Sequence, residues 1–265
     1  MSAASERGLA VVTGASRGIG YELAKQFARH DFDLVIAAEN AGITEAAREL
    51  ATLGAHVTPV QVDLSTADGV HKLYNTAIAS GRAVDAVAIN AGVGFGGPFA
   101  ETALEDDLRL VDLNVRSAVH LAKLVTQDMV GRRAGRVLFT SSIAATQPGP
   151  FQATYNASKS FLLSFSEALR EELKDTGVTV TALMPGPTET DFFDRAGITD
   201  TKLGQAKKDD PALVAKHGFD ALMSGKDHVV AGSVTNKVTA AAAKVLPESA
   251  KASVHRRMSE PGSGE

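Results

Sequence analysis

Residues 9–20 read Leu9-Ala-Val-Val-Thr13-Gly14-Ala-Ser-Arg-Gly18-Ile-Gly20, an apolar run followed by a turn with three glycines. The run at 9–13 predicts a short strand that is buried on both faces. After the turn, the apolar residues within 23–28 have the spacing of one helical face. The sequence therefore predicts a strand, a glycine-rich turn and a helix in direct succession.

This arrangement is typical of a phosphate-binding site. Glycines allow backbone N–H groups to approach a pyrophosphate, and the start of a helix favours its negative charge. The glycine spacing here is GxxxGxG and differs from the GxGxxG fingerprint. A tight turn that binds no ligand is the alternative at this point.

The segment Gly14-Ala-Ser16-Arg-Gly18 also matches GxSxG, the nucleophile elbow of α/β-hydrolases. A hydrolase needs earlier strands and an oxyanion loop before this elbow. Only thirteen residues precede Gly14, so its position argues against a hydrolase.

The rest of the chain alternates between strand-like and helix-like segments. Strands are predicted at 33–38, 56–62, 84–89, 135–140, 177–183 and 227–231, and helices at 41–53, 67–79, 104–129, from 155 onward and at 212–223. Such alternation predicts an α/β fold with right-handed crossovers. We expect a doubly wound parallel sheet of about seven strands with helices on both faces, a Rossmann-like three-layer αβα arrangement.

Polar residues follow several of these strands. Glu39, Asp63, Asn90 and Ser142 each come at or just after a strand's carboxyl end. Parallel sheets bind their ligands at that edge. The glycine turn and these four residues therefore predict one crevice for a dinucleotide.

Glu39 bears on which dinucleotide is bound. It lies nineteen residues after Gly20, where an acidic side chain can hydrogen-bond the adenosine ribose hydroxyls. Its charge would repel a 2′-phosphate, which favours NAD. Arg17 in the turn would neutralise that phosphate, so NADP stays open.

Tyr155-Asn-Ala-Ser-Lys159 places a phenol and an ammonium four positions apart in a helix-like segment. Residues at this spacing share one helical face. A free phenol has a pKa of about 10, too high for proton exchange near neutral pH. An ammonium about 4 Å away stabilises the phenolate by about 4 kcal/mol, or about three pKa units. The pair predicts a proton-transfer group, and an ordinary surface pair is the alternative.

Composition excludes several functions. The chain has 265 residues, 44% hydrophobic and 22% charged, with a net charge of −4 and no cysteine. The weak negative charge argues against nucleic acid as a partner. Absence of cysteine excludes disulfides, a thiol nucleophile and cysteine-based metal sites. With no apolar run near 18 residues, we expect no membrane span and a cytoplasmic protein.

We expect one domain over 1–258. Within it, the irregular stretch at about 185–211 is predicted to be a substrate loop that acts as a lid, and about 234–257 a helical tail; 259–265 is predicted to be disordered. Phe161 and Leu162 point to different sides of the helix after Tyr155, which predicts a homo-oligomer, a dimer or tetramer.

At this point the chain resembles the short-chain dehydrogenase/reductase family. The matching segments are Thr13–Gly20, Asn90-Ala-Gly92, Asn114, Ser142, Tyr155-Asn-Ala-Ser-Lys159 and Pro185-Gly-Pro-Thr-Glu-Thr190. The resemblance implies NAD(P)-dependent oxidation of an alcohol or reduction of a carbonyl, without metal. One departure is Ile89 where the family usually has a first asparagine.

By this resemblance, Tyr155 is the general acid/base and Ser142 hydrogen-bonds the substrate oxygen. Lys159 lowers the tyrosine pKa and holds the nicotinamide ribose, and Asn114 anchors a water relay to it. The predicted dinucleotide contacts are Thr13, Gly14, Ser16, Arg17, Gly18, Ile19, Gly20, Glu39, Asp63, Leu64, Asn90, Ala91, Gly92, Tyr155, Lys159, Pro185, Gly186 and Thr188.

A small alcohol or carbonyl compound is the expected substrate. Phe95, Phe151, Phe192 and Phe193 are candidates for an apolar substrate pocket, with plain core packing as the alternative. A non-catalytic dinucleotide sensor on the same fold is the alternative function. Such a sensor would keep the glycine turn and lose the tyrosine or the lysine, whereas this chain keeps both.

Overall fold

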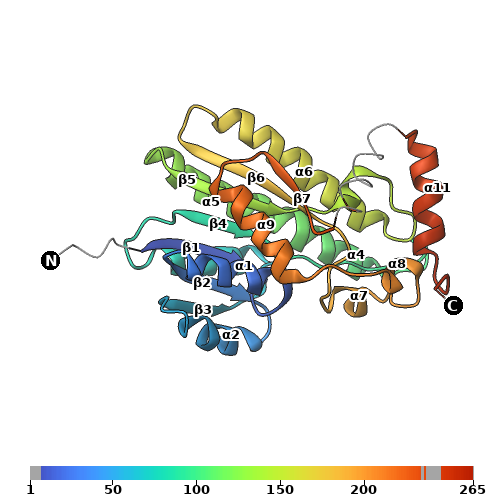
Figure 1. Cartoon of the computed structure of the whole chain (residues 1–265), viewed down its shortest axis with the longest axis horizontal. Coiled ribbons are helices and arrows are strands. Elements are labelled where there is room, and N and C mark those ends of the chain that lie inside the picture. Colours follow the sequence, from blue (N-terminus) through green and yellow to red (C-terminus); the bar gives the residue numbers. More distant parts are fainter. Residues whose placement is uncertain (1–6, 234–235, 237–245, 265) are drawn as a thin grey trace.

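A computed structural model of the chain describes residues 7–233, 236 and 246–264. Seven parallel strands form one sheet in the order β3-β2-β1-β4-β5-β6-β7 (Figure 1). They are β1 (Gly8–Thr13), β2 (Phe32–Ala38), β3 (Val57–Gln61), β4 (Ala86–Ile89), β5 (Gly135–Thr140), β6 (Val178–Pro185) and β7 (His228–Ala231). The predicted doubly wound parallel sheet is confirmed. The order reverses between β1 and β4, where such sheets open a crevice.

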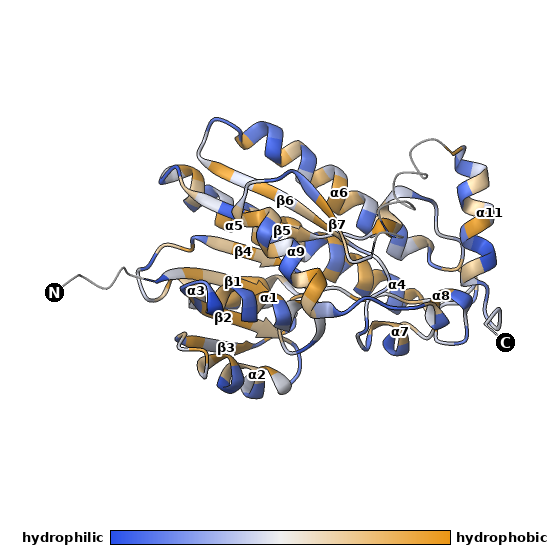
Figure 2. Cartoon of the chain, viewed as in Figure 1, coloured by the Kyte–Doolittle hydropathy of each residue, from blue (hydrophilic) through white to orange (hydrophobic). Residues whose placement is uncertain are grey.

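Helices cover both faces of the sheet. The main ones are α1 (Gly18–Arg29), α2 (Gly42–Ala51), α3 (Ala67–Ile78), α4 (Leu104–Val111), α5 (Ser117–Gly131), α6 (Ala153–Leu173) and α9 (Pro211–Met223). One apolar layer packs α1, α2 and α9 on the sheet, and the other packs α3, α5 and α6. Alternate residues of β1 serve the two layers: Val12 faces the first and Val11 the second. In Figure 2 the strands are mostly hydrophobic, and the helices that cover the sheet are hydrophilic on their outer sides.

The predicted helix at 104–129 is interrupted. A π-helical turn, η1 (Asp112–Arg116), separates α4 from α5 and has Asn114 at its centre, 1% exposed. Such turns contain one extra residue and are frequent at functional sites. The spacing of apolar residues did not reveal it, because a single inserted residue shifts that spacing only slightly.

The carboxyl side of the sheet is covered by the C-terminal third. The predicted irregular loop at 185–211 contains two short helices, α7 (Phe192–Arg195) and α8 (Lys202–Gln205), and α11 (Glu248–Ser259) follows near the end of the chain. Figure 1 shows all three beyond the carboxyl ends of the strands. Of the predicted helical tail, 234–235 and 237–245 lie outside the described residues.

The end of the chain differs from the predicted disorder. Residues 260–264 form a turn, in which the Gly262 N–H donates to the Asp200 carboxylate at 2.7 Å and the Gly264 N–H to the Asp200 carbonyl at 2.9 Å. These two bonds hold the turn beside α8. The composition of this segment is polar and glycine-rich, so the contact with Asp200 could not be expected from it.

None of the described helices combines the length and apolarity needed to cross a bilayer. On α6, Leu162 is 3% exposed and Phe161 is 39% exposed. The predicted homo-oligomer stays a prediction.

Candidate active site

The glycine turn is shaped so that backbone lines the crevice. Gly14 and Gly18 have φ of +68° and +60°, a region that favours glycine. A Cβ on Gly20 would lie 2.2 Å from the Gly14 carbonyl oxygen. The first turn of α1 has no side-chain cap and no acidic residue, so its N–H groups are open to an anion. The turn therefore fits a pyrophosphate.

Thr13 and Asn90 tie the turn to the neighbouring strand. The Thr13 hydroxyl accepts hydrogen bonds from the backbone N–H groups of Asn90 and Ala91, both at 2.9 Å. The Asn90 side-chain amide donates to the Thr13 carbonyl at 3.1 Å. Asn90 and Ala91 join the ends of β1 and β4, although Ile89 replaces the usual first asparagine.

A cavity of about 820 Å³ begins at the glycine turn and extends along the carboxyl edge of the sheet. It is lined by the predicted residues Gly14, Ser16, Arg17, Gly18, Ile19, Gly20, Glu39, Asp63, Leu64, Asn90, Ala91, Gly92, Ser142, Tyr155, Lys159, Pro185, Gly186, Thr188, Phe192 and Phe193. The predicted residues Thr13, Asn114, Phe95 and Phe151 do not line it. The sequence motifs therefore converge on one cavity, and these four residues lie outside its lining.

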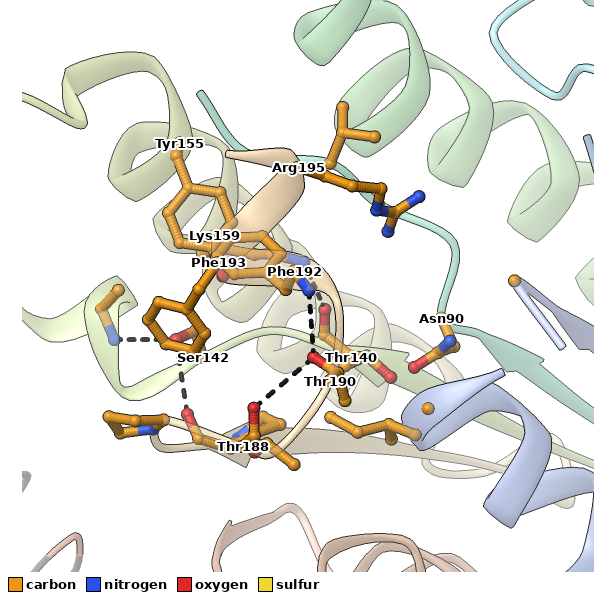
Figure 3. Close-up of a pocket in the computed structure, with 18 of the residues that line it drawn as sticks. Asn90, Thr140, Ser142, Tyr155, Lys159, Thr188, Thr190, Phe192, Phe193 and Arg195 are labelled. Carbon is orange, nitrogen blue, oxygen red and sulfur yellow. Dashed lines mark hydrogen bonds between the residues drawn. The ribbon is translucent and has the colours of Figure 1, made fainter. Parts of the chain in front are cut away.

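Tyr155 and Lys159 lie together in this cavity, on the first turns of α6 (Figure 3). The Lys159 Nζ is 5.7 Å from the centre of the tyrosine ring and donates to the Thr140 carbonyl at 2.9 Å. Lys159 is 5% exposed. The Ser142 hydroxyl accepts from the Ala144 N–H at 3.1 Å. A phenol, a hydroxyl and an ammonium thus face one space.

The pKa of Tyr155 differs from the sequence-based expectation. Burial raises it to about 12, and a hydrogen bond with Ser142 only partly opposes this rise. Burial lowers the pKa of Lys159 to about 8. The expected acidification of the tyrosine is therefore wrong for this structure, because exclusion of water penalises both charged forms. Near neutral pH the phenol holds its proton and the lysine is mostly charged.

Asn114 acts on the backbone beside the cavity. Its Oδ1 accepts from the Val93 N–H and its Nδ2 donates to the Val93 carbonyl, both at 2.9 Å. The same Nδ2 donates to the Ser158 hydroxyl at 3.1 Å. These bonds fix the loop after β4 against α6. The water relay predicted for Asn114 stays a prediction.

The end of the crevice beside the glycine turn carries several charges. Glu39 accepts a hydrogen bond from Arg109 of α4 at 2.6 Å, and Arg17 pairs with Asp191. Partial burial raises the pKa of Asp63, but hydrogen bonds from Ser65 and the charge of Arg109 outweigh it and lower that pKa. An exposed pair such as Glu39–Arg109 contributes at most about 1 kcal/mol. Arg109 is seventy positions from Glu39, and no local pattern in the sequence indicates their contact.

Arg195 also lines the cavity, although no sequence motif singled it out. In Figure 3 its guanidinium points away from Tyr155, toward the side where Asn90 lies. Burial lowers its pKa, and the nearby Arg17 adds to this effect. Among the described residues it has no ion-pair partner within 4.0 Å, so it can meet an incoming anion.

The end of the cavity beside Tyr155 is built from the C-terminal third. The Phe192 ring lies 5.1 Å from the Tyr155 ring, and Phe193 packs at right angles against Phe192. Val254, His255 and Met258 of α11 form part of the same wall. No sequence signal indicated these three, because the segment that contains them lies a hundred residues from the tyrosine.

Phe151, predicted for the substrate pocket, is placed elsewhere. Its backbone has φ +65°, and its ring faces the Arg256 guanidinium of α11 at 5.3 Å. It therefore supports α11 from outside the cavity. Phe95 is half-buried in the loop after β4 and is likewise absent from the lining.

Two glutamines also face the cavity. Gln152, 3% exposed, is the residue before α6, and Gln147 follows the 3-10 turn η2 (Ile143–Thr146). Both line the cavity, and among the described residues neither side-chain amide takes a hydrogen bond. Gln152 is the buried one of the two, and buried amides normally have partners. A polar group of a ligand can supply one here.

Comparisons with known proteins agree with this geometry. A family model described as short chain dehydrogenase matches residues 8–200. A short chain dehydrogenase from Pseudocercospora fijiensis is 33% identical over 186 residues, which cover 69% of this chain and 60% of that relative.

Two solved structures are similar over most of their length. A short chain dehydrogenase/reductase from Burkholderia phymatum in complex with NAD has a TM-score of 0.83 and 25% identity, covering 91% of this chain and 92% of that one. A short-chain dehydrogenase from Sphingobium yanoikuyae in complex with NADPH has a TM-score of 0.79 and 26% identity, covering 84% and 87%.

Proposed function

The chain belongs to the short chain dehydrogenase family, and we propose that it transfers hydride between a nicotinamide dinucleotide and the carbon of a ketone or secondary alcohol. The observation that carries this proposal is the pairing of Tyr155 and Lys159 inside the cavity that begins at the glycine turn. A bound nicotinamide ring would supply or accept the hydride. The protein's part is to bind, to orient and to move a proton.

We assign the proton to Tyr155. Its phenol donates to the carbonyl oxygen in reduction, while the Ser142 hydroxyl hydrogen-bonds the same oxygen as its negative charge develops. Because burial raises the pKa of Tyr155 to about 12, the tyrosine rests in the form that donates a proton. This is the protonation state that carbonyl reduction requires.

Lys159 has two proposed tasks. Its ammonium holds the ribose beside the nicotinamide, and its charge stabilises the phenolate that remains after proton transfer. The charge costs free energy when buried, as the lowered pKa shows. Its hydrogen bond to the Thr140 carbonyl fixes the Nζ at the base of the cavity.

The glycine turn is proposed to bind the pyrophosphate, and Glu39 the adenosine ribose hydroxyls. Glu39 leads us to propose NAD as the preferred coenzyme. Arg17 and Arg195 line the same end of the cavity and lower the cost of an added phosphate, so NADP remains a second coenzyme for this site.

The substrate is proposed to be a neutral carbonyl compound with an apolar body. Phe192, Phe193, Val254 and Met258 supply the apolar wall. Gln152 precedes the first residue of α6 and lines the same cavity as Tyr155. We propose that its amide hydrogen-bonds a second polar group of the substrate.

Tyr155→Phe tests the catalytic assignment. We expect turnover to fall by about 10²–10⁴-fold, while coenzyme affinity measured by calorimetry stays within about twofold, because only one hydroxyl is removed. Tyr74→Phe is the matched control, since its hydroxyl bonds Asp128 on the surface and should leave turnover unchanged. Undiminished turnover in Tyr155→Phe would remove the tyrosine from the reaction.

Gln152→Leu tests the substrate assignment on a panel of ketones measured at the nicotinamide absorbance. We expect kcat/KM to fall about tenfold, the effect of one lost buried hydrogen bond, for ketones with a second polar group. Simple alkyl ketones should be unaffected. An equal loss for both classes would contradict the assignment.

A further inference from the structure

Glu39 does not stand alone at the adenosine end of the crevice. It follows β2 directly, and its Oε2 accepts a hydrogen bond from the Arg109 Nη2 of α4 at 2.6 Å. The two side chains are 43% and 48% exposed. Pairs of this kind are weak and open easily. Arg109 can therefore compensate the Glu39 charge without locking the carboxylate.

The charges around this end are balanced by Arg109. Arg17, Arg195, Glu39, Asp63 and Asp191 line the cavity, two positive groups against three negative ones. Arg109 adds the third positive charge, and its field also reaches Asp63. With Arg109 the cluster is neutral; without it the cluster has one excess negative charge.

We propose that Arg109 sets the coenzyme range of this protein by neutralising Glu39, so that the adenosine end accepts a 2′-phosphate as well as a free 2′-hydroxyl. The inference rests on the proposed function. Arg109 acts through Glu39 and is a positioning residue. A free carboxylate about 5 Å from a phosphate at a half-exposed site weakens binding by on the order of tenfold, and the arginine removes that penalty.

The experiment measures binding instead of turnover. Isothermal titration of NADH and NADPH into the full chain gives the ratio of the two Kd values. The variants are Arg109→Ala, Glu39→Gln and the double variant. Arg116→Ala is the matched control, an arginine two helical turns away that is exposed and pairs with Asp112.

The wild type is expected to bind both coenzymes with Kd values within about tenfold of each other. Arg109→Ala should raise the Kd for NADPH about tenfold and leave that for NADH within about twofold. Glu39→Gln should shift the ratio toward NADPH. In the double variant, the loss of Arg109 should no longer change the ratio, because the charge it neutralises is gone.

Several results would overturn the inference. They are an unchanged ratio in Arg109→Ala, an equal loss for both coenzymes, or a wild type that binds only NADH. A double variant that binds NADPH more weakly than Glu39→Gln does would also overturn it, because Arg109 would then act by contacting the phosphate directly. A wild type that binds neither coenzyme would overturn the proposed function itself. If the wild type binds both coenzymes but Arg109→Ala does not change the ratio of the two Kd values, only this inference is overturned.

Discussion

The two ends of the cavity are built by different means. The glycine turn at the nucleotide end is made of backbone: glycines, strand ends and N–H groups tied by hydrogen bonds of Thr13 and Asn90. The substrate end is made of side chains from α7, α8 and α11, which come from remote parts of the chain. Backbone geometry tolerates almost no added atom, whereas side-chain walls can be rebuilt by substitution. The first end should therefore be fragile and the second adaptable.

Gly20→Ala should break the nucleotide end and has the largest expected effect. The new Cβ would lie 2.2 Å from the Gly14 carbonyl oxygen and 2.6 Å from the Asn90 amide nitrogen. Since backbone must move, we expect the free energy of unfolding to fall by about 3 kcal/mol and coenzyme affinity to fall at least about tenfold. Urea unfolding and calorimetry measure the two effects.

Gly131→Ala is its control. A Cβ at Gly131, the last residue of α5, meets no atom within 4 Å. It should leave stability equal or slightly higher and binding unchanged. A Gly20→Ala protein as stable as Gly131→Ala would show that the turn is less tight than its geometry indicates.

Lys159→Met tests how the burial of this lysine makes the stability of the protein depend on pH. The lysine pKa is about 8 in the folded chain against an ordinary value of 10.5, so between these values the unfolded chain binds more protons. Stability due to this group therefore rises with pH in that window, by about 2 kcal/mol from pH 7.5 to 9.5. Tyr155, with a raised pKa, acts in the opposite direction only above pH 10.

The Lys159→Met variant should lack this rise in urea unfolding. Lys174→Met, which removes an exposed lysine paired with Glu171, should keep it. If the wild type and Lys159→Met show the same pH dependence, the ammonium of Lys159 is not desolvated as the structure indicates.

Asp191→Asn probes the contact between the substrate loop and the glycine turn and has the smallest expected effect. Asp191 pairs with Arg17 across the crevice, and the two side chains are 53% and 51% exposed. Loss of such a pair should change global stability by less than about 1 kcal/mol. Amide hydrogens of 189–198 should exchange up to about fivefold faster, because the pair joins the substrate loop to the glycine turn.

Asp194→Asn, an exposed change on α7, is the control for exchange. It should leave the exchange of 189–198 as in the wild type. Equal acceleration by both variants would mean that the loop responds to lost negative charge in general and is not held by the Arg17 pair.

The backbone-built end could be predicted well from the sequence and the other end poorly, for physical reasons. Gly14, Gly18 and Gly20 lie within seven residues, so a local pattern records their geometry. Tyr155 and Lys159 are linked by helical periodicity. The contact of Arg109 with Glu39 and the wall from α11 depend on tertiary packing, which leaves no periodic trace.

Two further differences between the sequence prediction and the structure have physical causes that a sequence pattern does not contain. The raised pKa of Tyr155 comes from exclusion of water, which depends on everything packed around the ring. The π-helical turn at Asp112–Arg116 places Asn114 behind the cavity wall, where it bonds Val93.

The hydrogen bonds of Thr13 bear on the order in which parts of the fold are completed during synthesis. Its hydroxyl is held by backbone groups that come 77 and 78 positions later in the chain. On the ribosome, the phosphate turn emerges long before the strand that secures it. The turn therefore gains these two hydrogen bonds only after β4 has been synthesised and has paired beside β1.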